Sequence, residues 1–255
     1  SFETLYDPFM MEGMKTAVKH IEKVIAEKKN ILVYGDYDVD GTTAVSLVVS
    51  YLKSSYEQVA FYIPDRYKEG YGISYQGIDF AADNDIDLII ALDCGIKAVK
   101  QVEYAKEKQI DFIICDHHRP GDILPDAIAV LDPKRTDCSY PYKELCGCGI
   151  GFKLIQALSI EKGESFDDLI QYLDLVAIAI AADIVPVTGE NRTLAHFGLQ
   201  RINSSPRPGI QALIGQLDKE SLSITDVVFG IAPKINAAGR IEQGSLAVEL
   251  LTETD

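Results

Sequence analysis

Short apolar runs constrain the fold of this chain most strongly. They lie at 31–34, 88–92, 111–115 and 127–131, and a further run at 58–63 is stopped by Pro64. Runs of this length between polar residues are typical of strands in a parallel sheet, where helices cover both faces. Segments with helical spacing separate several of the runs. The sequence therefore predicts βαβ units and an α/β fold whose sheet is doubly wound and mostly parallel.

Apolar residues at helical intervals predict the helices. Asp7-Pro8 is typical of an N-cap followed by a proline in the first turn, so a helix is expected over 9–28. Further helices are expected over 41–54, 96–108, 149–162 and 166–182. After residue 191 we expect shorter helical pieces broken by prolines. The sheet should therefore be followed by a helical segment.

Composition limits the class of protein. With 255 residues, 47% of them hydrophobic and 25% charged, the chain should bury a proper core. No apolar run approaches the roughly 20 residues that cross a bilayer, and no signal-peptide pattern is present, so we expect no membrane association. The scattered cysteines are typical of reduced thiols in a cytoplasmic protein. Cys138, Cys146 and Cys148 leave a zinc site open, although their spacing fits no standard pattern and no nearby histidine completes it.

The net charge bears on how the chain could interact with nucleic acid. A formal charge of −15 and a pI near 4.7 argue against non-specific coating of nucleic acid through a broad basic face. They leave open an enzyme with a local basic groove. They are also typical of a protein that gathers carboxylates around metal ions.

Three aspartates follow the first apolar run at alternate positions: Asp36, Asp38 and Asp40. If the chain stays extended that far, all three side chains point the same way. Crowded carboxylates repel and raise each other's pKa, whereas a hard divalent cation would reverse that effect. An acidic surface turn is the alternative interpretation.

Acids follow the other apolar runs as well. Asp93 follows 88–92, Asp116-His117-His118 follows 111–115, and Asp183 follows an apolar run at 175–182. The carboxyl ends of parallel strands line one edge of a sheet, so these side chains should converge with the first three. For Asp93 or Asp183 alone, a helix N-cap is the alternative. Several carboxylates with a single imidazole suit Mn²⁺ or Mg²⁺ better than zinc, and bridging carboxylates favour a two-ion site of the kind that cleaves phosphoesters.

These residues resemble a known family. Gly35 to Gly41 and Asp116-His117-His118 are similar to the first and third motifs of the DHH phosphoesterase superfamily. Within it, the chain most resembles the single-stranded-DNA-specific 5′→3′ exonucleases of bacteria, over essentially its whole length. The segments that carry this likeness are 64–72, 92–95, 181–186, 191–192, 201–203 and 233–240.

The resemblance implies a role for each candidate residue. The metal ligands would be Asp36, Asp38, Asp40, Asp93, His117 and Asp183. Asp93 would bridge two ions, His118 would face the scissile phosphate, and Asp116 would orient the histidines. Arg240 and Asn236 would bind phosphate, and Arg66 would guide the strand or its 5′ end, with a surface ion pair as the alternative for either arginine. Tyr34 departs from the pattern, because many superfamily members carry a histidine ligand there; either Asp36 serves in its place or one ion is held weakly.

The resemblance also implies an activity. It is the metal-dependent hydrolysis of single-stranded DNA from the 5′ end to 5′-mononucleotides, with a helicase or a single-strand-binding protein as candidate partners. Residues 1–203 would form the catalytic domain, and 204–255 a helical connector to a second domain of the DHHA1 type that this sequence lacks. Two alternatives remain. One is a superfamily enzyme acting on short oligoribonucleotides, cyclic dinucleotides or pyrophosphate, and the other is a non-catalytic scaffold.

Overall fold

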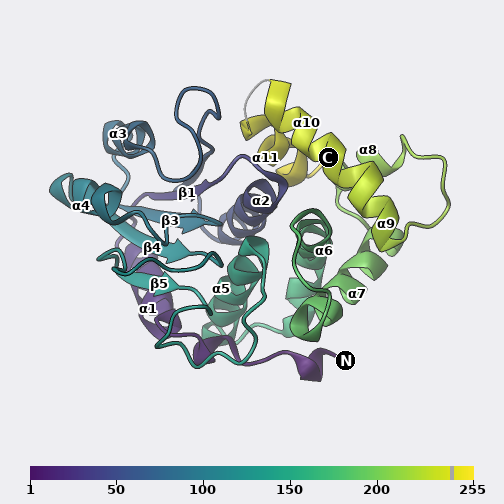
Figure 1. Ribbon diagram of the computed structural model, residues 1–255, viewed down its shortest axis with the longest axis horizontal. Helices are drawn as coiled ribbons and strands as arrows, with labels where there is room; N and C mark the ends of the chain where they lie inside the picture. Colours follow the sequence, from purple (N-terminus) through teal and green to yellow (C-terminus); the bar gives the residue numbers. More distant parts are fainter. Residues whose placement is uncertain (242–243) are drawn as a thin grey trace.

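The computed structural model describes residues 1–241 and 244–255, and its centre is a five-stranded parallel sheet (Figure 1). The strand order is β2-β1-β3-β4-β5. The strands are β1 (Ile31–Gly35), β2 (Val59–Tyr62), β3 (Leu88–Leu92), β4 (Asp111–Cys115) and β5 (Ala129–Leu131). Gly35 lies opposite Leu92, which lies opposite Cys115, so three neighbouring strands end in register. The residues that follow these strands therefore emerge side by side at one edge.

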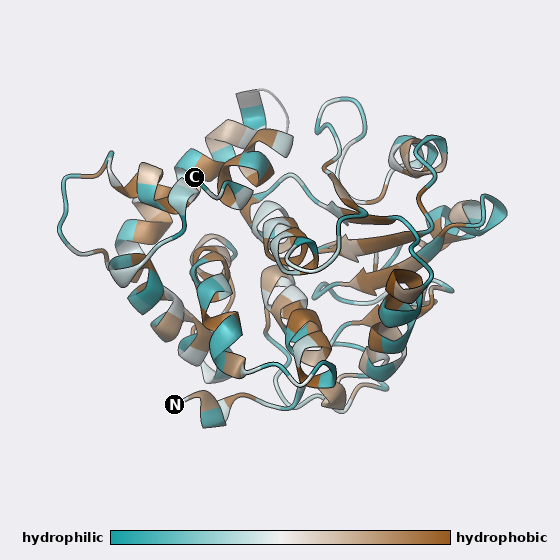
Figure 2. Ribbon diagram, turned by 180° about the vertical axis from the view of Figure 1, so that it is seen from behind, coloured by the Kyte–Doolittle hydropathy of each residue, from teal (hydrophilic) through white to brown (hydrophobic). Residues whose placement is uncertain are grey.

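Helices cover both faces of the sheet. On one face lie α1 (Met14–Ala26), α2 (Val39–Lys53) and α5 (Gly147–Glu161). On the other lie α3 (Tyr75–Asp83) and α4 (Val99–Glu107). Figure 2 shows the apolar strands enclosed between these layers, with hydrophilic residues on the outer faces of the helices. The chain turns to opposite sides of the sheet after β1 and after β3, which is the topological switch point of a doubly wound sheet.

The later part of the chain is helical. It comprises η3 (Phe166–Tyr172), α6 (Leu173–Ala182), α7 (Gly189–Ser204), α8 (Pro208–Ile214), α9 (Ile224–Asp226), the π-helical turn η4 (Val227–Ile231), α10 (Ala232–Ile241) and α11 (Ser245–Thr252). Helix α6 packs against α2 and α7, and α11 returns to pack on α2. The segment after residue 204 thus lies against the sheet domain (Figure 1). Within the described residues, no helix combines the length and apolarity that a membrane crossing requires.

The predicted fold class is confirmed, and each expected strand is within two residues of its observed position. Several helix predictions were wrong in detail. Helix α1 begins at Met14, because Pro8–Met10 forms a separate 3-10 turn capped by Asp7. Helix α3 was not expected. The predicted helix over 166–182 is a 3-10 helix followed by α6, and α7 is longer than the short pieces expected after residue 191.

Candidate metal centre

The first three aspartates leave the sheet by different routes. Asp36 directly follows β1, and the chain does not stay extended through residue 40, which was the condition for all three side chains to point the same way. Asp38 is the N-cap of α2 and accepts a hydrogen bond from the Gly41 N–H at 2.7 Å. Asp40 lies in the first turn of that helix. Asp36 and Asp40 are almost fully buried, so the alternative of an acidic surface turn was wrong.

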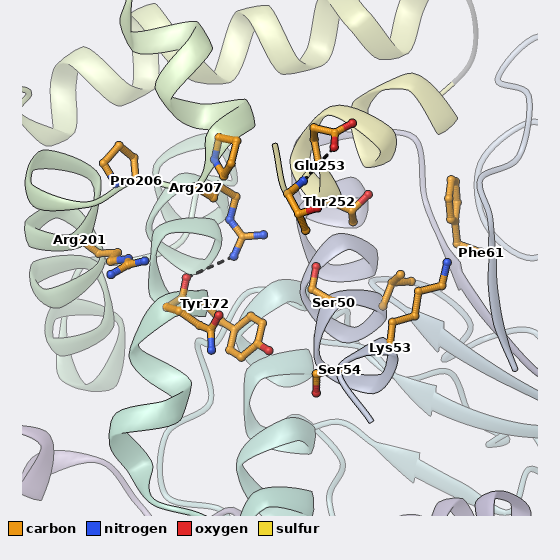
Figure 3. Close-up of a pocket in the computed structure, with 14 residues that line it drawn as sticks. Ser50, Lys53, Ser54, Phe61, Tyr172, Arg201, Pro206, Arg207, Thr252 and Glu253 are labelled. Carbon is orange, nitrogen blue, oxygen red and sulfur yellow. Dashed lines mark hydrogen bonds between the residues drawn. The ribbon is translucent and has the colours of Figure 1, made fainter. Parts of the chain in front are cut away.

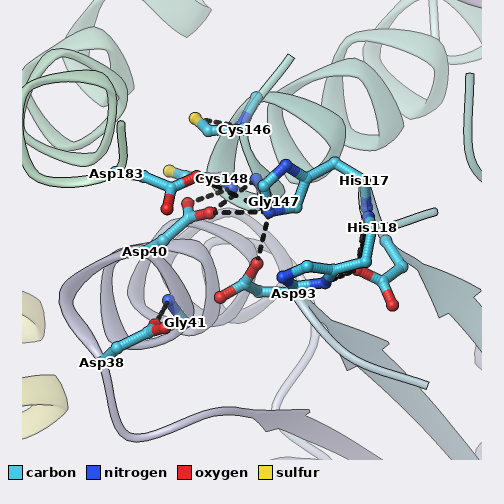
Figure 4. A network of polar contacts seen from close by, with 12 residues as sticks. Asp38, Asp40, Gly41, Asp93, His117, His118, Cys146, Gly147, Cys148 and Asp183 are labelled. Atoms are coloured by element: carbon cyan, nitrogen blue, oxygen red, sulfur yellow. Dashed lines mark hydrogen bonds and ion pairs between the residues drawn. The ribbon is translucent and has the colours of Figure 1, made fainter. Parts of the chain in front are cut away.

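His117 is the centre of the carboxylate cluster (Figure 4). Its Nε2 lies 2.9 Å from Asp93 Oδ1, 3.4 Å from Asp40 Oδ2 and 3.6 Å from Asp183 Oδ2. Asp93 follows β3 and His117 lies two residues after the end of β4, while Asp40 is in α2 and Asp183 ends α6. The structure therefore brings together four of the six predicted ligands around one imidazole nitrogen. Asp183 follows the last turn of α6 and Asp93 lies five residues before the Ala98 N-cap of α4, so the N-cap alternative for them was wrong.

The start of α5 holds Asp40 in place. The main-chain N–H groups of Gly147 and Cys148 each donate to one Asp40 carboxylate oxygen, both at 2.8 Å. The helix dipole adds positive potential at this end. Gly147 is also required by space, because a Cβ there would lie 2.5 Å from Asp93 Cβ and 2.6 Å from Asp93 Oδ1. Sequence reasoning did not single out Gly147, and it named Cys148 only as part of a possible zinc site.

Asp93 has an uncommon backbone conformation. Its φ is +61°, in the left-handed region that side chains other than glycine, asparagine and aspartate seldom adopt. The Asp93 N–H donates to Cys115 O at 2.9 Å, which ties this turn to the end of β4. The strained turn aims the carboxylate at His117 rather than along the sheet.

Asp116 fixes the second histidine. Its Oδ1 lies 2.6 Å from His118 Nδ1 and accepts the His117 and His118 N–H groups, while Oδ2 accepts the Ile96 N–H. Burial opposes ionisation of Asp116, but the contacts with His118 and these N–H groups bring its pKa below the usual value. The pKa of His118 rises because of the same hydrogen bond. His118 is half-exposed, and its bond to Asp116 leaves Nε2 available to a ligand.

Burial and like charge raise the pKa values of the other acids. Burial is the main cause for Asp36 and Asp40, whose pKa values are each about 7, and it raises the Asp93 pKa well above its usual value, with Asp40 adding to the effect. Burial also lowers the His117 pKa, which favours the neutral imidazole that a cation binds. Oxygen donors with one neutral imidazole fit Mn²⁺ or Mg²⁺. A divalent ion would remove the repulsion that the bare cluster carries.

Asp36 and Tyr34 make contacts away from this cluster. Asp36 Oδ1 accepts the Tyr37 N–H and Oδ2 accepts the Gly72 N–H. The Tyr34 hydroxyl donates to Gly72 O at 2.9 Å and lies on the α3 side of the sheet. The close His/Cys/Asp/Glu groupings that could hold an ion are Asp40, His117 and Asp183, and Asp93 with 116–118; neither includes Asp36, Asp38 or, among the described residues, any cysteine. The roles of Asp36 and Asp38 as ligands stay predictions.

Of the three predicted substrate residues, Asn236 borders the cluster. Asn236 on α10 lines a cavity of about 150 Å³ together with Asp38, Asp40 and Asp183. The Arg66 guanidinium lies 4.6 Å from the centre of the Tyr37 ring. Arg240 is exposed in the last turn of α10, and the preceding Gly239 lies beside Tyr37 O.

A larger cavity, of about 580 Å³, lies between α2, α7 and the end of α11 (Figure 3). Its Arg207 is already engaged: Nε contacts the buried Asp174 carboxylate at 3.0 Å, and the other nitrogens donate to Leu251 O and Gln171 O. This arginine therefore joins three helical segments. These contacts join α6, η3 and α11 at the wall of the cavity.

The fold and the cluster define a class of protein: parallel α/β proteins with a carboxylate and histidine site for divalent cations at the carboxyl edge of the sheet. Comparison with known proteins identifies the family. Residues 30–180, more than half of the chain, match the model of the DHH family, N-terminal domain. The chain belongs to the DHH family, and the predicted resemblance is confirmed.

Individual relatives show which members of the family the chain resembles. The single-stranded-DNA-specific exonuclease RecJ of Bacillus subtilis is 45% identical over 257 residues, covering 98% of this chain and 31% of the relative. A crystal structure of exonuclease RecJ bound to manganese matches with a TM-score of 0.88 and 32% identity over 96% of this chain and 62% of the other. RecJ of Thermus thermophilus in complex with Mg²⁺ matches with a TM-score of 0.71 and 28% identity, covering 96% and 32%. The chain thus spans about a third of the length of the Bacillus relative.

Proposed function

We propose that this protein is a metal-dependent exonuclease that hydrolyses single-stranded DNA from its 5′ end to 5′-mononucleotides. The contact of one imidazole nitrogen with three carboxylates, of which Asp40 and Asp93 are buried and Asp183 is partly exposed, carries the proposal, because a cation would stabilise such a crowded set of donors. The names of the relatives supply the substrate class, and the manganese and magnesium structures support the choice of ions. The proposed cofactor is two Mn²⁺ or Mg²⁺ ions.

The residues that would hold the ions are those that converge at the sheet edge. They are Asp36, Asp38, Asp40, Asp93, His117 and Asp183. When bound, such ions activate water and stabilise charge on the phosphoryl oxygens. The α5 N–H groups hold both Asp40 oxygens in position, and these hydrogen bonds favour the ionised form that a cation requires, against the effect of burial. Asp93, whose Oδ1 lies 2.9 Å from His117 Nε2, would be the ligand that both ions share.

His118 and three further residues would bind the substrate. Asp116 fixes His118 Nδ1, so the free Nε2 of His118 would donate to the scissile phosphate. The raised pKa of His118 favours the protonated donor. Arg66, Asn236 and Arg240 would bind the DNA phosphates, and guanidinium groups suit this role because they form paired hydrogen bonds.

Other parts of the proposal concern organisation and partners. Residues 1–203 would form the catalytic unit, and 204–255 the helical connector to a second domain. A helicase or a single-strand-binding protein would deliver the DNA. The five buried, free cysteines support a reducing, cytoplasmic location.

Substitution of Asp93 tests the activity. Asp93→Asn is preferred to Asp93→Ala, because asparagine also accepts a positive φ and so preserves the turn. We expect Mn²⁺-dependent cleavage of a 5′-labelled single strand to fall by at least about 10²-fold, the size of loss that follows removal of a group stabilising transition-state charge. Asp85→Asn is the matched control, because Asp85 also has a positive φ (+56°) but is exposed and precedes β3, at the end of the strand opposite Asp93.

Two outcomes would overturn the proposal. An unchanged rate in Asp93→Asn would place the chemistry elsewhere. A clear preference of the unsubstituted protein for dinucleotides or cyclic dinucleotides over long 5′-labelled DNA would instead indicate the short-substrate enzymes of the superfamily.

A further inference from the structure

The loop between β2 and α3 carries Tyr71, which contacts residues of the candidate centre, and Arg66, which packs on the Tyr37 ring. It rises at the edge of the sheet beside α3 (Figure 1). The Tyr71 ring approaches His118 edge-on at 6.3 Å and Tyr37 at 5.8 Å, and its hydroxyl lies 3.4 Å from Asp93 O. The Arg66 guanidinium lies over the Tyr37 ring, 4.6 Å from its centre. The conformation of the loop therefore determines whether Tyr71 lies beside His118.

Little side-chain packing holds the part of the loop next to Tyr71. Gly70 and Gly72 flank it, with φ of +79° and +90°. A Cβ placed on either glycine would have no heavy atom within 4 Å. Glycine gives a chain high conformational freedom, so this part of the loop needs other contacts to keep one conformation.

Strand β1 supplies those contacts from below. The Tyr34 hydroxyl donates to Gly72 O at 2.9 Å and accepts the Ser74 N–H at 3.0 Å. Asp36 Oδ2 accepts the Gly72 N–H at 2.9 Å. Both main-chain polar groups of Gly72 are therefore bound by side chains of β1 and the residue after it. The Tyr34 ring is fully buried and stacks on Tyr62 at 5.3 Å, so its hydroxyl has a fixed position.

The base of the loop is closed by a second set of contacts. Glu69 Oε1 accepts the hydroxyls of Tyr62 and Ser74, both at 2.6 Å, and Oε2 accepts the Asp65 N–H at 2.6 Å. These bonds join the two ends of the 65–74 segment to each other. They do not reach Gly72, which depends on Tyr34 and Asp36.

We propose that Tyr34 is a positioning residue, whose hydroxyl holds the 65–74 loop so that Tyr71 and Arg66 face the DNA substrate. It acts through Gly72 and Ser74 and touches neither the ions nor the substrate. The substrate part of this inference rests on the function proposed above. The loop-holding part rests only on the contacts of β1 with the loop.

Tyr34→Phe removes the hydroxyl and keeps the buried ring. The loop contains Arg66 and Lys68, so trypsin can report its opening without any nuclease assay. We expect cleavage of the native protein after these two residues to become about tenfold faster, the effect of losing the bonds of one buried hydroxyl. In the nuclease assay with single-stranded DNA, KM should rise severalfold while kcat at saturation and Mn²⁺ affinity are retained.

Tyr51→Phe is the matched control. Tyr51 is a buried tyrosine on α2 whose hydroxyl bonds to Glu164, far from the loop. It should leave both tryptic cleavage in the loop and KM unchanged, even if global stability falls as much as in Tyr34→Phe.

The outcomes separate the two parts of the inference. Tryptic cleavage as slow as in the unsubstituted protein would show that Tyr34 does not hold the loop. Faster cleavage with an unchanged KM would show that the held loop does not serve DNA binding, which overturns the positioning role. If the unsubstituted protein cleaves no DNA, the proposed function fails, and the tryptic comparison still decides whether Tyr34 holds the loop.

Discussion

Substituting Gly147 by alanine should damage the metal centre without touching a ligand directly. The added Cβ would lie 2.5 Å from Asp93 Cβ, 2.6 Å from Oδ1 and 2.8 Å from Cγ. Carbon atoms in good contact are about 3.5–4.0 Å apart, so one side must withdraw by about 1 Å. If α5 withdraws, the Gly147 and Cys148 N–H groups leave Asp40. If Asp93 withdraws, its contact with His117 is lost.

The expected loss follows from that displacement. Inserting a methyl group into a packed site costs about 1–3 kcal/mol, and 1.4 kcal/mol is about a tenfold change in an equilibrium constant. We therefore expect the Mn²⁺ affinity of Gly147→Ala to fall by about 10- to 100-fold. Calorimetric titration of the metal-free protein with Mn²⁺ measures this directly, and circular dichroism checks that the fold persists.

Gly151→Ala is the matched control on the same helix. A Cβ at Gly151 would lie 3.5 Å from Leu92 Cδ2 and Val48 Cγ2, which is ordinary contact. Alanine also favours a helix by about 1 kcal/mol over glycine, so this variant should be at least as stable as the original and bind Mn²⁺ equally well. Equal Mn²⁺ affinity in Gly147→Ala and Gly151→Ala would refute the idea that the close approach of α5 shapes the centre.

Two further predictions concern titration and a buried ion pair. The pKa of Asp40, about 7, exceeds its unfolded value of 3.8, so the metal-free protein should lose stability as pH rises from about 4 to 7. The apparent Mn²⁺ affinity should increase over the upper part of that range, because the proton leaves Asp40. Urea unfolding should therefore show stability falling with pH and calorimetry should show Mn²⁺ affinity rising, and a flat Mn²⁺ affinity from pH 6 to 8 would contradict this prediction. Lys153 is fully buried and its Nζ lies 2.6 Å from Glu190 Oε2, so Lys153→Met should lower the free energy of unfolding by about 3–5 kcal/mol, and adding Glu190→Gln should restore much of that loss. Urea unfolding measures both variants, and a Lys153→Met protein as stable as the original would show that the ion pair is dispensable.

The apolar runs made the sheet predictable because its strands are buried on both faces. The run 88–92 is observed as β3 with unchanged bounds. Helix α3 escaped prediction because only Gly77, Ile78 and Ala81 are buried, too few for a clear helical pattern. The start of α2 was placed late because Asp38 was interpreted as part of an extended acidic row rather than as an N-cap.

Only those parts of the candidate site that depend on short sequence patterns could be predicted. Acids after apolar runs indicated the sheet edge, since parallel strands carry their carboxyl ends there. The hydrogen bonds from Gly147 and Cys148 to Asp40 join residues more than a hundred positions apart, so no local sequence pattern predicts them. The contact of Tyr34 with Gly72 likewise depends on how α3 and its preceding loop pack on the sheet.

The segment after β1 serves two structures at once because strand side chains alternate between faces. Tyr34 and Asp36 point to the side of α3, where they bind the 65–74 loop. The helix that begins at Val39 then carries Asp40 to the opposite side, where α5 holds it beside His117. A change at Tyr34 should therefore alter DNA binding with the metal affinity retained, whereas a change at Gly147 should alter metal affinity with the loop unchanged. Tryptic cleavage of Gly147→Ala in the loop at the original rate, together with weaker Mn²⁺ binding, would demonstrate that the two structures are independent. Accelerated cleavage would show instead that the loop and the metal cluster form one cooperative unit.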